Sequence, residues 1–271
     1  MENLYEPLKT KVLDILTETP TIKTLVLKPP SAIPFRAGQF MQLTVFGIGE
    51  APFTPSSSPF DTDTMEITIL KAGHLTEAVH ELKPGDWVGL RGPFGQGYPL
   101  SKFKGKEILV VGGGVGLAPL RALLYALFHN LDDFKRISIK YGARNPIELS
   151  FRKQYQEWQN LKNVDFDCTV DRANGNWDGK VGLVTELLEN TGIDLENAYA
   201  VSCGPEIMLK FVTLKLLNVG FKSDQIYLSM NRKMSCGMGI CGRCNIGPYY
   251  LCKDGPDMNF AEIEKYPDVF G

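Results

Sequence analysis

The chain has 271 residues, of which 44% are hydrophobic and 22% charged, and its formal net charge is −2. These values are ordinary for a globular protein and give no reason to expect nucleic acid or an anionic membrane as partner. No apolar stretch approaches the roughly 20 residues of a membrane span, and the N-terminus lacks the features of a secretory signal. We therefore expect a cytoplasmic protein without membrane insertion, built from two domains and a small third module.

The first part of the chain, residues 1–103, is a run of short β segments. Strands are expected at 11–30 (two strands joined by a turn at Glu18–Thr21), 35–47, 65–71 and 86–95. Glycine and proline separate these segments, which favours a closed or nearly closed antiparallel barrel. One helix is expected at 75–82, because Leu75, Val79 and Leu82 fall on one face.

The pattern changes near Phe103. Residues 107–111 form a short apolar run, typical of a parallel strand buried on both faces, and a glycine-rich turn and a helix to about Asn130 follow it. Further strands are expected at 136–143, 164–170 and 198–204, and helices at about 149–160, 182–190 and 205–219. This alternation predicts a parallel sheet with helical crossovers over residues 104–225.

The last segment, 226–271, is rich in cysteine. Cys236, Cys241, Cys244 and Cys252 have the spacing C-x4-C-x2-C-x7-C. The opening C-x4-C-x2-C is that of plant-type [2Fe–2S] proteins, whereas structural zinc sites more often use two C-x2-C pairs. Glycines between the cysteines let the backbone wrap round a cluster and turn N–H groups toward its sulfurs. We predict an iron–sulfur cluster; a structural zinc site and disulfides or free thiols are the alternatives.

The glycine-rich turn, Gly112–Pro119, reads GGGVGLAP between a strand and a helix. Glycine lets the backbone approach an anion closely, and the helix start offers free N–H groups and a positive dipole end. The string is not the G-x-G-x-x-G fingerprint, because Pro119 stands where the last small residue would be. On this string alone, phosphate binding and a purely structural turn both remain open.

Four motifs taken together resemble the ferredoxin–NADP reductase superfamily: GGGVGLAP, Tyr141–Arg144, Cys203–Pro205 and the cysteine segment. The similarity covers nearly the whole chain. The branch it resembles contains the gamma (diaphorase) subunit of sulfhydrogenases, the corresponding subunit of anaerobic sulfite reductase, and the electron-transfer subunit of type B dihydroorotate dehydrogenases. The resemblance implies an FAD-binding barrel at 1–103, an NAD(P)-binding α/β domain at 104–225 and a [2Fe–2S] module at 226–271.

The superfamily's flavin motif, Arg-x-Tyr-Ser/Thr, corresponds here to Ala51–Thr54. By resemblance, Phe53 lies against the FAD and Thr54 hydrogen-bonds near flavin N5. Ala51 departs from the pattern, since the arginine that meets the FAD pyrophosphate is missing. The turn 73–76 at a helix start can supply N–H groups and a hydroxyl in its place, with Lys71 as a supplementary cation. Glu50-Ala51-Pro52 is similar to what the hydrogenase-type members carry.

The predicted cofactor contacts and catalytic residues follow from these motifs. On the flavin side they are Pro52, Phe53, Thr54, Ser56, Ile69, Lys71, Gly73, Leu75 and Thr76. On the nicotinamide side they are Gly113, Gly114, Gly116, Leu117, Ala118, Pro119, Gly142, Arg144, Cys203, Gly204 and Pro205. Thr54 and Cys203 are the predicted catalytic residues. By resemblance Cys203 sits beside nicotinamide C4, and a buried core cysteine is the alternative.

The choice between NAD and NADP stays open at this point. Arg144, Arg152 and Lys153 suit a 2′-phosphate, whereas Asp171-Arg172 combines an acid suited to a bare ribose with a base. The pattern leans slightly to NAD.

The resemblance implies an NAD(P)H-dependent oxidoreductase subunit of the diaphorase type. Flavin is needed because nicotinamide donates two electrons as hydride, whereas the cluster accepts one at a time. No second catalytic centre is visible, so we expect iron–sulfur and catalytic subunits of a larger redox complex, such as a hydrogenase or related reductase, as partners. The alternatives are a free-standing ferredoxin:NAD(P) reductase and a non-catalytic redox-sensing protein that docks through a metal knot.

Overall fold

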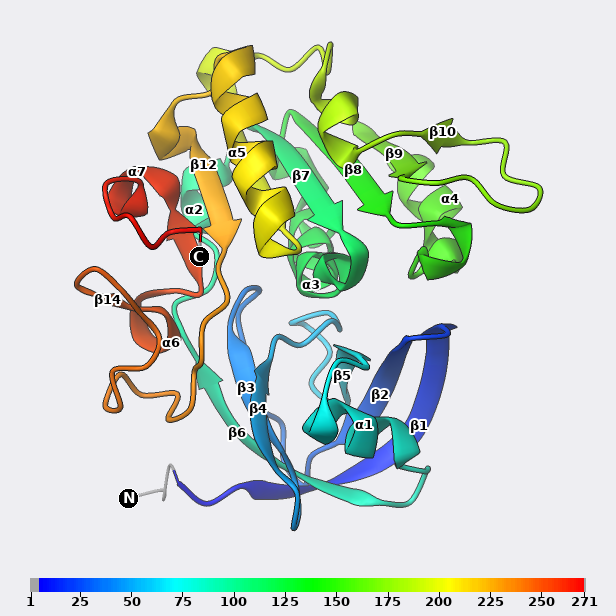
Figure 1. Cartoon of the computed structure of the whole chain (residues 1–271), viewed down its shortest axis with the longest axis vertical. Coiled ribbons are helices and arrows are strands. Elements are labelled where there is room, and N and C mark those ends of the chain that lie inside the picture. Colours follow the sequence, from blue (N-terminus) through cyan, green and yellow to red (C-terminus); the bar gives the residue numbers. More distant parts are fainter. Residues whose placement is uncertain (1–4, 271) are drawn as a thin grey trace.

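The computed structural model describes residues 5–270, arranged as a lower antiparallel sheet, an upper parallel sheet with helices, and a C-terminal module along one side (Figure 1). The lower sheet has the strand order β4-β3-β6-β1-β2-β5. Its strands are β1 Leu8–Thr19, β2 Ile22–Lys28, β3 Phe40–Val45, β4 Gly49–Phe53, β5 Met65–Leu70 and β6 Trp87–Phe94. An isolated bridge between Pro55 and Ile67 joins the end of β4 to β5. The two edges therefore meet, and the predicted antiparallel barrel is confirmed.

Buried side chains from alternating strand positions fill this barrel, among them Val12, Leu25, Leu43 and Ile67. Helix α1, His74–Glu81, begins one residue before the expected helix. Strand β4 was not among the expected strands, because its sequence Gly-Glu-Ala-Pro-Phe lacks the β-branched residues that favour a strand. It forms because β3 offers a complete antiparallel edge from Met41 to Val45.

The upper sheet has seven strands in the order β10-β9-β8-β7-β11-β12-β15. They are β7 Glu107–Gly113, β8 Arg136–Ala143, β9 Val164–Val170, β10 Lys180–Val181, β11 Ala198–Cys203, β12 Ile226–Ser229 and β15 Asp257–Asn259. All neighbours pair in parallel except β12 and β15. The predicted parallel sheet is confirmed, with one antiparallel strand added at its edge.

Helices cover both faces of this sheet. They are α2 Leu100–Phe103, α3 Leu117–His129, α4 Tyr155–Gln159 and α5 Glu206–Val219. Residues of β7 alternate between two cores: Val110 packs with the α3 side and Leu109 with the α5 side. This alternation explains why the strand is apolar at every position.

Two expected helices are shorter than the sequence suggested. The helix expected at 149–160 is interrupted because Phe151 adopts a left-handed conformation with φ 57°, so the α-helical part begins only at Tyr155. The helix expected at 182–190 is a five-residue 3₁₀ helix, η5 Val184–Leu188. The helical conformation ends at Glu189, whose backbone is extended with φ −77° and ψ 134°. The other 3₁₀ helices are η1 Gly114–Gly116, η2 Leu131–Asp133, η3 Pro146–Glu148, η4 Arg152–Gln154, η6 Leu195–Asn197 and η7 Ser223–Gln225.

The C-terminal module is continuous with the upper sheet. Its elements are the hairpin β13 Asn245–Ile246 and β14 Tyr249–Tyr250, then α6 Leu251–Asp254, β15 and α7 Phe260–Ile263. Strand β12, at the start of segment 226–271, pairs with β11, and β15 then pairs with β12. The module also packs on the barrel, where Phe40 and Phe94 belong to the same core as Leu251 and Met258. The division into three units at residues 103 and 225 stays a prediction.

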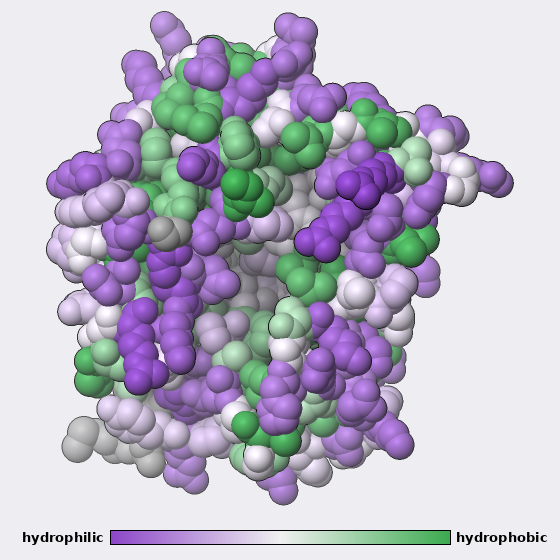
Figure 2. Space-filling view, viewed as in Figure 1, coloured by the Kyte–Doolittle hydropathy of each residue, from purple (hydrophilic) through white to green (hydrophobic). Residues whose placement is uncertain are grey.

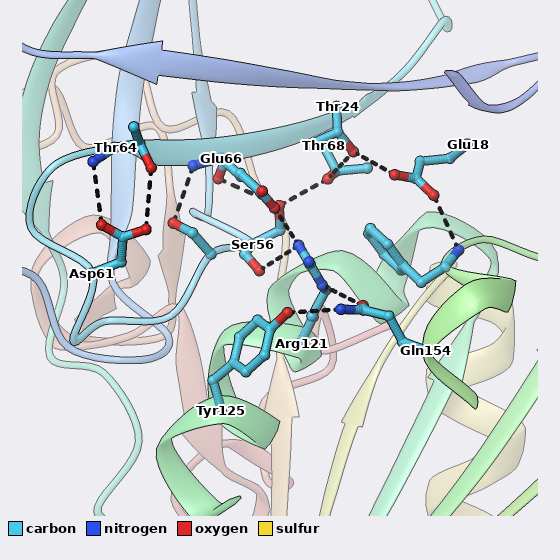
Figure 3. Close-up of polar contacts among 12 residues, drawn as sticks. Glu18, Thr24, Ser56, Asp61, Thr64, Glu66, Thr68, Arg121, Tyr125 and Gln154 are labelled. Carbon is cyan, nitrogen blue, oxygen red and sulfur yellow. Dashed lines mark hydrogen bonds and ion pairs between the residues drawn. The ribbon is translucent and has the colours of Figure 1, made fainter. Parts of the chain in front are cut away.

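The face of the molecule seen in Figure 2 is mostly hydrophilic and is hollowed between the barrel below and the upper sheet. Arg121 of α3 joins the barrel to the α/β domain (Figure 3). Its guanidinium donates to the Ser56 carbonyl at 3.1 Å and to Gln154 Oε1 at 2.7 Å, and it forms an ion pair with Glu66. The Arg121 side chain is only 10% exposed, so this charge depends on partners from both domains.

We predict that Arg121→Met lowers the melting temperature of the holoprotein by roughly 5–10 °C, because it leaves the Glu66 carboxylate poorly solvated and unpaired. Arg121→Met/Glu66→Gln should recover much of the loss, since no uncompensated charge remains. Lys162→Met, which removes an exposed ion pair with Asp132, is the control and should have little effect. Equal losses in the single and double variants would contradict this explanation.

Candidate active site

The carboxyl ends of the parallel strands point toward the barrel (Figure 1), which is the edge where ligands bind in open α/β sheets. Here the structure brings two predicted motifs into contact. A Cβ at Gly116 would lie 2.4 Å from the Cys203 carbonyl oxygen, and one at Gly113 would lie 2.1 Å from Met208 Sδ. No side chain fits at either glycine, so the glycine turn and the Cys203 turn pack directly on each other.

Gly114 differs from its neighbours. Its φ is 54°, and a Cβ there would meet nothing within 4 Å. The turn is therefore open to an incoming group at this position, immediately before the first turns of η1 and α3. Leu117 and Ala118, by contrast, are buried in the core, so only their backbone could contact a phosphate.

The remaining nucleotide-side residues lie along the same edge. Arg144 follows β8 and is exposed, and its carbonyl accepts a hydrogen bond from the Arg172 N–H at 3.1 Å. Asp171 follows β9 beside it. Gly142 is a packing position, because a Cβ there would lie 2.8 Å from Val184 Cβ. Arg144, Asp171 and Arg172, which were considered for ribose or 2′-phosphate recognition, thus lie at the ends of neighbouring strands.

Cys203 ends β11 and is 8% exposed. Burial raises the pKa of its thiol to about 12. The group is therefore a neutral thiol at physiological pH, and it is suited to packing against a ring rather than to nucleophilic attack.

Asp257 is a buried acid close to Cys203 that sequence reasoning did not single out. It lies on β15 opposite Ser229 and is 8% exposed, and neither carboxyl oxygen has a well-aligned hydrogen-bond partner among residues 5–270. Burial raises the pKa of this carboxyl to about 7, although the hydroxyls of Ser229 and Tyr98 oppose the rise. In the sequence Asp257 follows Gly255-Pro256, which predicts a turn. Only the pairing of β15 with β12 shows that Asp257 is a buried strand residue.

The predicted flavin contacts lie where β4, β5 and α1 meet. Pro52, Phe53 and Thr54 are half-buried at the end of β4. A Cβ at Gly49 would contact the Leu75 side chain at 3.9 Å, which places β4 against α1.

Several other predicted flavin residues have structural partners of their own. Ser56 is fully buried, with its hydroxyl 2.8 Å from Thr68 Oγ1, and Ile69 lies in the barrel core. The Thr76 hydroxyl accepts hydrogen bonds from the N–H groups of Ala72 and Gly73 at 2.8 and 2.9 Å. Because that hydroxyl caps its own turn, the backbone N–H groups of the first turn of α1 are the donors best placed for an anion. Lys71 is exposed.

Cys236, Cys241 and Cys244 lie in the loop between β12 and β13, and Cys252 lies on α6. Residues 236–252 are called the cysteine loop. Cys236 lies within hydrogen-bonding reach of Cys241, and Cys252 within reach of Cys244. Backbone N–H groups point at the sulfurs: those of Met238 and Ile240 at Cys236 Sγ, both at 3.4 Å, and that of Gly239 at Cys252 Sγ, at 3.0 Å. Burial alone would raise the pKa of Cys236, but the donated N–H bonds lower it.

This arrangement is compatible with the four-cysteine ligand set of a [2Fe–2S] cluster. The thiols form two pairs, as four cysteines shared between two irons would require. Cys244 and Cys252 are buried and Cys236 is half-buried, whereas Cys241 is exposed.

A separate groove lies on the sheet face beside η5, with a volume of about 610 Å³. Its walls are charged, and Lys140 sits between Asp165 and Asp167 at 2.8 and 2.6 Å. These charges satisfy one another, and the groove contains none of the predicted site residues.

Comparison with known proteins assigns the chain to a protein family. Residues 10–98 match the oxidoreductase FAD-binding domain, 110–213 the oxidoreductase NAD-binding domain, and 231–264 the iron–sulfur cluster binding domain of dihydroorotate dehydrogenase B. Sulfhydrogenase 1 subunit gamma of Pyrococcus furiosus is 35% identical over 99% of this chain and 96% of its own length. This chain belongs to the same family.

Two further relatives support the assignment. A probable dihydroorotate dehydrogenase B (NAD(+)) electron-transfer subunit of Thermococcus kodakarensis is 36% identical over 83% of this chain and 84% of its own length. The fold matches that of the NADH-dependent reduced ferredoxin-NADP oxidoreductase with a TM-score of 0.77 and 24% identity, over 95% of this chain and 92% of that one.

The family is the ferredoxin–NADP reductase branch expected from the motifs, and the predicted FAD, nicotinamide nucleotide and iron–sulfur cofactors are confirmed. The chain is an oxidoreductase. None of the helices in residues 5–270 combines the length and apolar character needed to cross a membrane.

The raised pKa of Asp257 predicts a pH-dependent stability. The folded protein holds a proton that the unfolded chain releases near the ordinary value of 3.8. Stability therefore falls as pH rises from about 4 to about 7 and is unaffected by this group above that. Asp257→Asn removes the effect, so the melting temperature of the variant relative to wild type should increase between pH 5.5 and pH 8.

The control is Asp132→Asn, an aspartate whose side chain is 97% exposed. Its melting curve should follow that of wild type across this range. A constant offset between Asp257→Asn and wild type at every pH would mean that the buried carboxyl does not titrate in this window.

Proposed function

We propose that this chain is the NAD(P)H-oxidising subunit of a larger redox complex and that it passes electrons to partner iron–sulfur subunits through a [2Fe–2S] cluster held by Cys236, Cys241, Cys244 and Cys252. The observation that supports this most is the placement of the cysteine loop. It packs on barrel strands next to β4, while the same barrel faces the nucleotide edge of the parallel sheet. The cysteine loop and the nucleotide edge of the sheet thus both adjoin the barrel that carries the predicted flavin contacts.

The predicted site residues have separate roles in binding the cofactors. When bound, FAD accepts a hydride equivalent from the nicotinamide and the cluster carries single electrons. The open turn at Gly114 and the start of α3 hold the nucleotide phosphates through backbone N–H groups. Cys203 packs its neutral thiol against the nicotinamide, and Phe53 and Thr54 orient the flavin from β4. Asp171 and the NAD(+) in the name of the Thermococcus relative favour NAD over NADP.

The partner meets the protein at the exposed edge of the cysteine loop. Cys241 is the exposed ligand, and the neighbouring Ile240 is 68% exposed. Arg243 and Lys253 are exposed beside it. An exposed apolar side chain beside two cations fits a one-electron carrier whose contact surface is acidic. Since the relatives are named as subunits of a sulfhydrogenase and of a dihydroorotate dehydrogenase, partner subunits of a hydrogenase or related reductase are proposed, with a diffusible ferredoxin as the alternative.

The central experiment replaces one ligand. In Cys244→Ser, the EPR signal of the cluster and electron transfer to one-electron acceptors should be lost, while NADH still bleaches the flavin absorbance at close to the wild-type rate. Cys168→Ser is the matched control, because Cys168 lies on β9 outside the cysteine loop. If Cys244→Ser loses FAD instead, the assignment of the loop as a separate cluster site is wrong.

A second experiment tests the docking surface. Arg243→Glu/Lys253→Glu should slow reduction of an acidic one-electron carrier by roughly tenfold at low ionic strength, and the difference should shrink in about 0.5 M salt. Reduction of a basic carrier should not slow. Lys28→Glu/Lys83→Glu, which reverses two exposed charges on the barrel, is the control. Equal effects on both carriers would contradict an acidic partner.

Anaerobic purification from the native organism decides between a complex and a free-standing reductase. Stoichiometric iron–sulfur subunits should co-purify with the chain. A chain that purifies alone and reduces ferredoxin with NADH would establish the alternative.

A further inference from the structure

Glu50, which belongs to the hydrogenase-type sequence Glu50-Ala51-Pro52, has no task in the function described so far. Its side chain reaches across β3 to Arg91 on β6. Arg91 Nε donates to Glu50 Oε2 at 2.9 Å and Nη2 donates to Oε1 at 2.5 Å, and Thr44 Oγ1 donates to Oε2 at 2.9 Å. The pair is bidentate, which fixes the orientation of the guanidinium.

Arg91 also contacts the cysteine loop. Its Nη1 donates to the Cys236 carbonyl at 3.4 Å, and its side chain is 6% exposed. Gln42, the neighbour of Arg91 on β3, donates from Nε2 to the Met234 carbonyl. A Cβ at Gly237, where φ is 80°, would lie 2.7 Å from the Phe94 ring. Strands β3 and β6 therefore hold the start of the loop that carries the first cysteine ligand.

The same strand serves both cofactors. Glu50 and Phe53 lie on β4, three residues apart, which is about 10 Å at the rise of a β-strand. The strand with the predicted flavin contacts thus also carries the carboxylate that anchors the loop of the cluster. A rigid connection of this kind keeps the spacing of the two redox groups constant.

We propose that Glu50 and Arg91 are positioning residues that tie Cys236 to the flavin-binding strand and set the reduction potential of the cluster by balancing each other's charge. The proposal rests on the assignment of Cys236 as a cluster ligand. Reduction adds one negative charge to the cluster. A nearby cation favours that step and a nearby anion opposes it, and both effects are strong where little water screens them.

The two members of the pair therefore predict opposite shifts. Glu50→Gln removes one negative charge beside the guanidinium, so the midpoint potential of the cluster should rise. In Arg91→Gln the carboxylate is no longer compensated, so the potential should fall. Each change should be roughly tenfold in the reduction equilibrium, equivalent to about 59 mV for a one-electron couple. Glu50→Gln/Arg91→Gln should lie close to wild type.

The measurement is an EPR-monitored redox titration of the holoprotein at pH 8. Glu189→Gln, which breaks the ion pair with Lys215 in the α/β domain, is the control and should leave the potential unchanged. Arg91→Lys keeps the charge and should stay near the wild-type potential. If Arg91→Gln loses the cluster, the test is a rise in Glu50→Gln against no shift in Arg91→Lys.

The outcomes separate this proposal from the proposed function. Shifts of opposite sign support the charge-balanced tether. Shifts of the same sign, or none, with an intact EPR signal overturn it and leave the electron-transfer function standing. Absence of any cluster signal in wild type would instead overturn the proposed function.

Discussion

The placement of the two large domains depends on the buried guanidinium of Arg121. A cation with little access to water must be paired and hydrogen-bonded, and here the partners are Glu66 and the Ser56 carbonyl from the barrel and Gln154 from the α/β domain. The guanidinium contacts all of these partners at once only in one relative orientation of the two domains. The ion pair therefore helps to fix the barrel against the α/β domain, together with the hydrogen bonds from Thr19 and Thr21 to Glu148.

The third unit is held by different means. Strand β15 extends the parallel sheet by pairing with β12, and the loop before α6 rests on β3 and β6 through Gln42 and Arg91. The cysteine module is therefore anchored to both domains at once. Such double anchoring suits a protein that must keep electron-transfer distances constant, because movement at either contact would change the distance between redox groups.

Two buried groups near the end of β11 have raised pKa values for the same physical reason. Burial raises the pKa of the Cys203 thiol to about 12 and that of the Asp257 carboxyl to about 7. Neither side chain is surrounded by enough water to solvate a charge. Fixed charges are instead found in the Arg121 and Arg91 ion pairs, whose partners neutralise them.

Local patterns in the sequence determined much of this protein. The apolar strands of the parallel sheet, the barrel segments, the glycine turn and the C-x4-C-x2-C-x7-C spacing can each be read from consecutive residues, because their periodicity or spacing expresses a local requirement. The tertiary structure alone decided which distant residues meet. The partners of Arg121 and Arg91, the burial of Asp257, the internal use of the Ser56 and Thr76 hydroxyls, and the break at Phe151 all depend on packing between segments far apart in the chain. A side chain's charge, solvation and free hydrogen-bonding capacity are set by those neighbours, and the order of residues does not contain them.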